Sequence, residues 1–170
     1  MNILLQESAD ILKKYFGERL DKMVVERAVF GLFFSGVKLS TGHGGLCFTP
    51  VKDIPEAVCC PSSAKAMPLS GKLSGRSVKS YLDDLSHANI LRKTLAIATL
   101  NALSACYWEE NKNLEYKIET DVDSFDVMEV PESKKSVVIG ALVPMLKKLL
   151  AADADFKVLE MDSRTLKGKE

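Results

Sequence analysis

The sequence predicts an α+β N-terminal domain with an antiparallel sheet and helices, followed by the first βαβ unit of an α/β domain. Two observations predict this fold class. First, β-branched and aromatic residues broken by glycines fill positions 24–49, which is typical of short antiparallel strands joined by tight turns. Second, a short apolar run, a glycine, a helical stripe and another short strand follow one another near the C-terminus, as in a βαβ unit.

Composition places the chain among ordinary globular proteins. Its 170 residues are 46% hydrophobic and 27% charged, with 23 basic and 23 acidic side chains. Because there is neither a net charge nor a basic stripe, we expect no nucleic-acid partner. Charged residues such as Glu26 and Lys38 interrupt the most apolar stretch, and the N-terminus lacks a secretory signal, so we expect no membrane partner and a cytoplasmic location.

The N-terminal elements follow from local signals. Apolar residues at helical spacing from Leu4 to Phe16 predict one packed helical face, and Gly17 follows where a left-handed residue would end the helix. After two or three strands, the glycines at 42, 44 and 45 favour a hairpin turn, and Pro50 ends the returning strand. Residues 51–76 are rich in proline, glycine and serine and predict a long surface loop.

Two helices are predicted beyond this loop. Ser77 is a candidate N-cap for a short helix, and the next helix, from Ile90, is apolar on most sides and therefore expected at the centre of the domain. Thr99 and Ser104 in this helix are explained by hydrogen bonds back to helix carbonyls. Asn101 is expected to be buried, where an unpaired amide would cost about 1–3 kcal/mol, so it either bonds loop backbone or faces a ligand.

The C-terminal part begins beyond an acidic stretch. Residues 119–132 carry six acidic side chains with no base between them, which predicts a domain boundary, with domains at 1–130 and 131–170. The apolar run from Ser136 to Ile139 is typical of a strand buried on both faces and ends at Gly140. A helical stripe from Val143 and a strand from Phe156 complete the βαβ unit, whose strands should be parallel.

Four segments also occur in the order seen in one known family. They are Leu-Ser-Gly-Arg at 73–76, Thr-Leu-Asn-Ala-Leu-Ser at 99–104, Val-Val-Ile-Gly at 137–140 followed by Val-Pro-Met-Leu at 143–146, and Val-Leu-Glu at 158–160. In these segments the chain resembles the heavy-metal chelation proteins, which combine an enolase N-terminal-like domain with a Rossmann-like domain. The resemblance implies a site for a metal ion or small ligand in the cleft between the two domains, and it implies no established reaction.

The resemblance also has a departure. The second domain of the family continues through several more strands, whereas this chain stops at Glu170, after one βαβ unit. A two-stranded parallel sheet cannot cover both of its faces, so the unit should be unstable alone. We therefore expect the chain to be a fragment of a longer protein, the alternative being a sheet completed by another chain, as in a homo-oligomer.

Five residues are candidates for ligand binding. Gly140 stands at the turn from strand to helix, and Glu160 ends the next strand, where a nucleotide-binding fold places a carboxylate against ribose hydroxyls. The other glycines of a dinucleotide fingerprint are missing, which favours an ordinary turn at Gly140, and for Glu160 a solvated strand end is an equally open reading. Gly75 and Arg76 precede a helix and could grip an anion, or Arg76 could be a surface arginine. Asn101 would complete this set.

His43, Cys59 and Cys60 are the candidate metal ligands; the sequence leaves the cofactor open, with a transition-metal ion ranked ahead of a nucleotide-like cofactor. Adjacent cysteines do not chelate as a Cys-x-x-Cys pair does, so packing cysteines and a turn histidine are the alternative. The cysteines are too few and too irregular for a disulfide framework. The resulting prediction is a metal-chelating or small-ligand-binding protein; the alternatives are an enzyme using a nucleotide-like cofactor such as S-adenosylmethionine and a non-catalytic interaction module.

Overall fold

The structure is a computed structural model that describes residues 3–50, 67–112, 115, 117, 119–128 and 135–161. It divides into two compact units, Met1–Glu115 and Tyr116–Glu170, which we describe one at a time. Together they form an α+β structure with one antiparallel and one parallel sheet, as the sequence predicts. In the described part of the chain, no helix is both long enough and apolar enough to cross a membrane.

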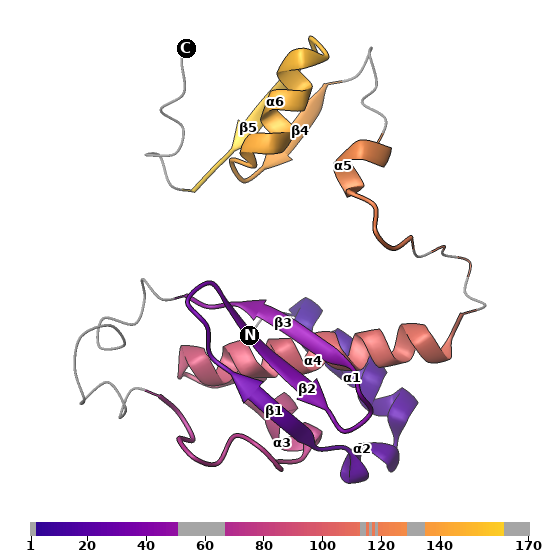
Figure 1. Ribbon diagram of the computed structural model, residues 1–170, viewed down its shortest axis with the longest axis vertical. Helices are drawn as coiled ribbons and strands as arrows, with labels where there is room; N and C mark the ends of the chain where they lie inside the picture. The colour runs from indigo at the N-terminus through magenta and orange to yellow at the C-terminus, as the bar shows by residue number, and fades with distance from the viewer. Residues whose placement is uncertain are drawn as a thin grey trace. The chain divides into compact units, whose positions relative to one another are not determined.

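The N-terminal unit carries a three-stranded sheet and the helices that cover it (Figure 1). Its strands are β1 (Val25–Val29), β2 (Phe34–Leu39) and β3 (Gly44–Phe48). Its helices are α1 (Ile3–Phe16), α2 (Arg19–Lys22), α3 (Val78–Leu82), the 3-10 helix η4 (Asp83–Ser86) and α4 (Ile90–Glu110). Two strands precede the hairpin turn and one follows it, which is the lower of the two numbers that the sequence allowed, and the predicted long apolar helix is confirmed.

Local signals set the ends of these helices. Gly17 follows α1 with φ of +51°, which is the left-handed conformation that the sequence predicted. The hydroxyl of Ser77 caps α3 by accepting a hydrogen bond from the Ser80 N–H at 3.2 Å. Asn89 caps α4 in the same way, accepting from the Arg92 N–H at 3.0 Å.

The sheet has the order β1-β2-β3, and both of its strand pairs are antiparallel. Val25 lies opposite Leu39 in the first pair, and Phe34 lies opposite Phe48 in the second. The predicted hairpin turn joins β2 to β3, with Gly42 at φ +90°. A glycine suits this position because a side chain there would be strained.

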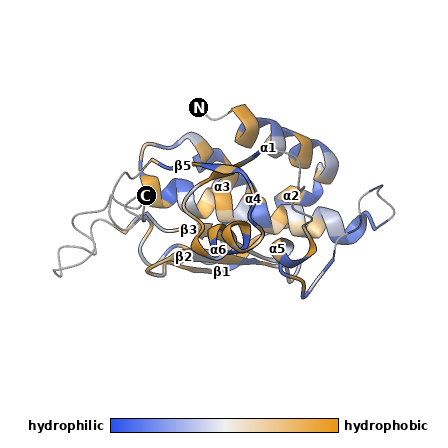
Figure 2. Cartoon of the chain, turned by 90° about the horizontal axis from the view of Figure 1, so that it is seen from above, coloured by the Kyte–Doolittle hydropathy of each residue, from blue (hydrophilic) through white to orange (hydrophobic). Residues whose placement is uncertain are grey.

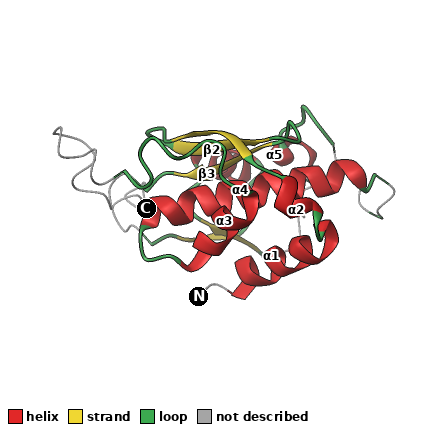
Figure 3. Cartoon of the chain, turned by 90° about the horizontal axis from the view of Figure 1, so that it is seen from below, coloured by secondary structure: helices red, strands yellow, loops and turns green. Residues whose placement is uncertain are grey.

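Helix α4 lies between the sheet and the shorter helices α1 and α3 (Figure 3). Its close approach to β3 depends on Gly45. A Cβ atom built on Gly45 would lie 2.1 Å from the carbonyl oxygen of Ala98 and 2.4 Å from the backbone nitrogen of Ala102. Since no side chain fits in that space, the glycine lets the helix backbone rest directly on the strand.

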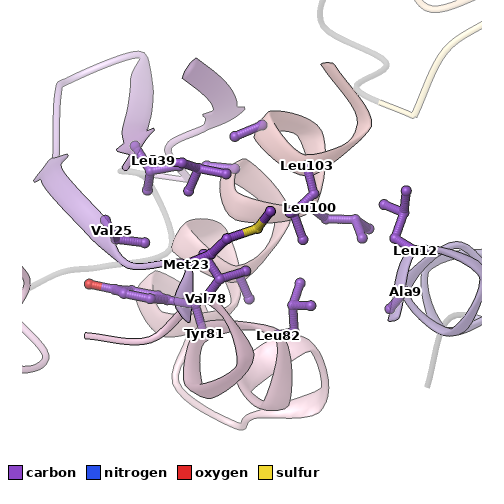
Figure 4. Close-up of a cluster of buried hydrophobic side chains, with 14 of the residues drawn as sticks. Ala9, Leu12, Met23, Val25, Leu39, Val78, Tyr81, Leu82, Leu100 and Leu103 are labelled. Carbon is purple, nitrogen blue, oxygen red and sulfur yellow. The ribbon is translucent and has the colours of Figure 1, made fainter. Parts of the chain in front are cut away.

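Hydrophobic side chains from the helices and the sheet meet in one core (Figure 4). Met23 lies in the middle of this cluster, between Val78 of α3 and Leu100 and Leu103 of α4. Burial of such side chains is the main favourable contribution to folding. Because α4 supplies much of this core, the prediction that it is central is confirmed.

Helix α1 buries less of its apolar surface than predicted. Leu12 and Phe16 lie in the core, whereas Leu4 and Ile11 are 69% and 62% exposed. Hydrophobic and hydrophilic turns alternate along α1 (Figure 2). The expectation of one packed face from Leu4 to Phe16 was therefore wrong for Leu4 and Ile11, because the buried face of α1 consists of Ala9, Leu12 and Phe16.

The C-terminal unit contains the predicted βαβ arrangement. Its elements are the short helix α5 (Ser124–Val127), β4 (Ser136–Ile139), α6 (Val143–Ala151) and β5 (Phe156–Leu159). Strands β4 and β5 pair in parallel, as predicted. The sequence did not predict α5, which Asp123 caps through a 2.9 Å hydrogen bond from the Phe125 N–H.

Strand β4 is covered on one face only in the described residues, which corrects the prediction that both of its faces are buried. Val138 is 2% exposed, whereas Val137 and Ile139 are 60% and 80% exposed. Leu159 of β5 shares their face and is 58% exposed. Alternate residues of a strand point to opposite faces, so only the face of Val138 packs against apolar side chains.

Candidate functional site

His43 is held in a polar cluster at the start of β3. Its side chain is 19% exposed, and its ring Nδ1 lies 3.0 Å from the hydroxyl oxygen of Thr41. The other ring nitrogen, Nε2, contacts the carboxylate oxygen Oε2 of Glu109. Both imidazole nitrogens therefore have partners, and the ring orientation is fixed from two sides.

The packing of α4 on β3 brings Glu109 to His43. The side chain of Asn101 donates a 2.8 Å hydrogen bond to the backbone oxygen of Leu46 on the edge strand β3. From Asn101 to Glu109 the helix rises about 12 Å, and from Leu46 back to His43 the strand spans about 10 Å. Because the two distances are similar, the packing of α4 on β3 that pairs Asn101 with Leu46 also places Glu109 beside the imidazole of His43.

A histidine nitrogen and a carboxylate oxygen side by side form the start of a metal site. Both groups bind zinc-like ions, and the second nitrogen of a metal-binding histidine usually bonds an oxygen, as Nδ1 of His43 does with Thr41. Structural zinc sites need four donors. Among the described residues, no group of three or more histidine, cysteine or acidic side chains is placed to hold a metal, so the described part supplies two donors.

The carboxylate of Glu110, the next residue of α4, is already hydrogen-bonded to other side chains of the protein. It accepts hydrogen bonds from both Arg19 Nη atoms at 3.0 and 3.1 Å and from the Tyr15 hydroxyl at 2.9 Å. The Arg19 guanidinium, followed by the Tyr15 hydroxyl, lowers the pKa of Glu110 below its ordinary value. Glu110 thus ties α4 to α1 and to Arg19, and it is a structural carboxylate rather than a free donor.

The cysteines in the described part are poor metal donors. Cys106 is buried, and Cys47 is half-buried. Burial raises the pKa of both thiols, which disfavours the thiolate form that binds metals. Cys59 and Cys60, the predicted ligands, lie outside the described residues.

Gly75 and Arg76 lie along the outer side of β1. Gly75 has φ of +77° and donates a 2.8 Å hydrogen bond to Val25 O, while Val25 N–H donates to Arg76 O at 2.9 Å. The Arg76 guanidinium stacks over the Tyr81 ring, 5.0 Å from its centroid. This segment therefore continues the sheet on the side opposite β3 and His43.

Asn101 differs from its expectation in two respects. The sequence placed it in a buried position, but the residue is exposed. Its amide donates to the backbone of strand β3 at Leu46, not to the loop backbone that the structural alternative named. The predicted back-bonding of its neighbours is confirmed, since Thr99 donates to Leu95 O at 2.8 Å and Ser104 donates to a helix carbonyl at 2.9 Å.

Gly140 and Glu160 are brought together in the C-terminal unit. Gly140 has φ of +91° and donates a 2.8 Å hydrogen bond to Leu159 O. The next N–H, of Ala141, donates to the Glu160 carboxylate at 2.8 Å. The sequence spacing thus led to two residues that meet at the turn before α6.

Within the N-terminal unit, His43 and Asn101 lie at β3, whereas Gly75 and Arg76 lie beyond β1 at the opposite edge of the sheet. Gly140 and Glu160 belong to the C-terminal unit. Sequence reasoning missed Glu109 as a partner of His43. No signal in the sequence could have paired them, because their contact depends on how α4 packs on the sheet.

A family comparison now adds to this geometry. The model of the DUF4213 family, described as "Putative heavy-metal chelation", matches residues 13–104, which is more than half of the chain. The chain belongs to this family. The matched range contains His43, Arg76 and Asn101, and it ends inside α4, before Glu109. Membership in the DUF4213 family confirms the resemblance noted from the sequence.

Two solved structures are similar to this DUF4213 chain, and both are proteins of unknown function from the DUF364 family. The protein from Pyrococcus horikoshii has a TM-score of 0.61 at 17% identity, over 96% of this chain and 57% of its own. The protein from Desulfitobacterium hafniense has a TM-score of 0.56 at 18% identity, over 95% of this chain and 60% of its own. At these identities the likeness shows the fold alone.

The chain thus spans less than two-thirds of the length of these solved relatives. A search among curated proteins found no match to the sequence.

Proposed function

We propose that this chain binds a heavy-metal ion, with His43 and Glu109 as its first two ligands. The contact between His43 Nε2 and Glu109 Oε2 carries the proposal. Thr41 supports it, since the second ring nitrogen of a metal-binding histidine usually bonds an oxygen, and Nδ1 of His43 lies 3.0 Å from the Thr41 hydroxyl. The description of the DUF4213 family names the same class of ligand.

The remaining ligands in this proposal are Cys59 and Cys60. Thiolates are the donors that soft metal ions prefer. The segment from Pro50 to Cys59 can span at most about 30 Å, whereas β3, which separates Pro50 from His43, is roughly 17 Å long. The chain is therefore long enough for a thiolate to reach His43. The proposed role of Cys59 and Cys60 as ligands is supported by this length and by the chemistry of thiolates.

Metal titration of the purified metal-free chain tests the proposal. Zinc and cadmium are each titrated by calorimetry, and bound metal is counted by mass spectrometry after gel filtration. We expect about one ion per chain, with affinity at least tenfold weaker in His43→Ala and in Glu109→Gln. The double variant Cys59→Ser with Cys60→Ser should lose cadmium more than zinc, because cadmium is the softer ion.

Two control variants make the test specific. His87→Ala removes the other histidine, whose Nδ1 accepts a 2.9 Å hydrogen bond from the Asn89 N–H, and should bind metal as the unaltered chain does. Cys47→Ser removes a half-buried thiol and should also have no effect. Unchanged binding in both His43→Ala and Glu109→Gln would refute the proposed site, and unchanged binding in the double cysteine variant would leave a site without Cys59 and Cys60.

The other sequence hypotheses stay open as alternatives. Asn101, Gly75, Arg76, Gly140 and Glu160 remain candidate residues for binding a small ligand. A nucleotide-like cofactor is the second candidate, favoured by the carboxylate of Glu160 at the Gly140 turn. A nucleotide-dependent rise in melting temperature that Glu160→Ala abolishes would support it.

A further inference from the structure

Arg76 has a charged nitrogen that the described residues leave unsatisfied. Its Nη1 atom is buried and has no hydrogen-bond partner. Arg76 as a residue is only partly buried, so other atoms of the residue are accessible to solvent. Buried polar atoms nearly always have partners, and a charged donor without one is costly, so this exception requires an explanation.

Arg76 is held in place through both its backbone and its guanidinium group. Its backbone pairs with β1 through Val25, and an isolated bridge joins the following residue, Ser77, to Val24. Its guanidinium lies over the ring of Tyr81, which is fully buried at the edge of the core cluster (Figure 4). The Tyr81 hydroxyl in turn donates to Leu73 O at 2.5 Å. The charge therefore has a defined position.

No acidic side chain of the described residues neutralises this charge. Asp84, which faces the same tyrosine, is buried, but it accepts hydrogen bonds from Arg92 Nε at 2.9 Å and from Arg92 Nη2 at 2.6 Å. Both oxygens of that carboxylate are thus committed to Arg92. In the described part of the chain, Arg76 takes part in no ion pair within 4.0 Å.

We propose that Arg76 binds the oxyanion group of a small ligand, a carboxylate or a phosphate. A planar guanidinium binds such groups through two parallel hydrogen bonds, and it does so most strongly where one face is already desolvated. Stacking on Tyr81 supplies that desolvated face. The site is distinct from the proposed metal site, because His43 directly precedes β3 and Arg76 lies beyond β1 at the opposite edge of the sheet.

Inorganic phosphate and acetate serve as probes, with chloride at equal ionic strength as the reference. Binding is followed by amide chemical shifts of Gly75 and Arg76 in isotope-labelled protein. We expect saturable shifts with at least one probe, weakened at least tenfold in Arg76→Gln. Arg76→Lys should bind more weakly than arginine, because a lysine offers a point charge without the paired donors.

The matched control is Arg27→Gln, which removes an exposed arginine from the neighbouring strand β1 and should leave the shifts unchanged. Saturation by phosphate alone would assign the site to phosphate esters, and saturation by acetate alone would assign it to carboxylates. Shifts that fail to saturate, or equal shifts in Arg76→Gln and the unaltered chain, would overturn the proposal. Metal titration of Arg76→Gln should match that of the unaltered chain, which keeps the two proposed sites separable.

Discussion

The carboxylate of Glu160 accepts a 2.8 Å hydrogen bond from the backbone N–H of Ala141, the residue after Gly140. This contact joins the end of β5 to the turn that follows β4. It also occupies a backbone donor that an anionic ligand at this turn would use. Glu160 therefore acts as a structural clamp that ties the end of β5 to the turn after β4.

Replacing Glu160 by alanine should loosen this turn. The Ala141 N–H loses its partner, which should cost the C-terminal unit about 1–2 kcal/mol. Hydrogen exchange at the Ala141 amide measures the effect, and we expect exchange to become about tenfold faster. Asp155→Ala removes an exposed carboxylate just before β5 and should leave exchange unchanged. Slow exchange in Glu160→Ala would mean that the clamp contributes nothing.

Two adjacent glycines of β3 should respond very differently to alanine. At Gly45 the added methyl group would meet the backbone of α4 at 2.1 Å, whereas at Gly44 the nearest atom, Val37 O, lies at 3.6 Å. Gly45→Ala should therefore destabilise the N-terminal unit by about 3 kcal/mol and Gly44→Ala by much less. Urea denaturation measures both values. Equal effects would show that α4 can move away from β3 at little cost.

A buried and an exposed ion pair provide a second contrast. Arg92→Ala would leave the buried carboxylate of Asp84 without its partner, and this should cost about 3 kcal/mol. Lys79→Ala breaks the exposed pair with Asp21, whose atoms lie 3.7 Å apart, and should change stability by less than about 1 kcal/mol. Thermal and urea unfolding of both variants give the comparison. A small effect in Arg92→Ala would mean that water reaches Asp84.

Glu110 should contribute to acid sensitivity. The Arg19 guanidinium and the Tyr15 hydroxyl lower its pKa in the folded protein below the ordinary value of 4.5. Its stabilising contribution is therefore complete above pH 4.5 and is lost as the pH falls through the lowered pKa. Glu110→Gln should be less stable than the unaltered chain at neutral pH.

The measurement is the urea midpoint between pH 3 and pH 7. Stability should fall less steeply with acidification in Glu110→Gln than in the unaltered chain. Glu7→Gln, at an exposed position of α1, should follow the profile of the unaltered chain. Parallel profiles for all three proteins would show that Glu110 has no part in acid sensitivity.

Several local features could be predicted from single residues. Gly17 adopts the left-handed conformation that ends α1, Ser77 caps α3, and Thr99 bonds back to its own helix. These predictions succeed because each depends on backbone angles and on hydrogen bonds to residues no more than four positions away. The strands β4 and β5 were predicted on similar grounds, from their short apolar runs.

Other expectations failed where distant packing decides the outcome. Ile139 belongs to an apolar run typical of a strand buried on both faces, yet it is 80% exposed. Asn101 lies in an apolar helix, but it faces the edge of the sheet and is exposed. An apolar pattern shows that a face can be buried, and it does not show whether another element covers that face.

For this protein, the sequence by itself determined the order and kind of most elements, the turn glycines and the family to which the chain belongs. Only the tertiary structure decided that Glu109 meets His43, that Gly45 admits α4 to the sheet, and that Arg76 stacks on Tyr81. The physical reason is how far apart along the chain the interacting residues lie. Turns and caps are set by neighbours in the chain, whereas these contacts exist only after helices and strands dock, and docking geometry depends on the whole core.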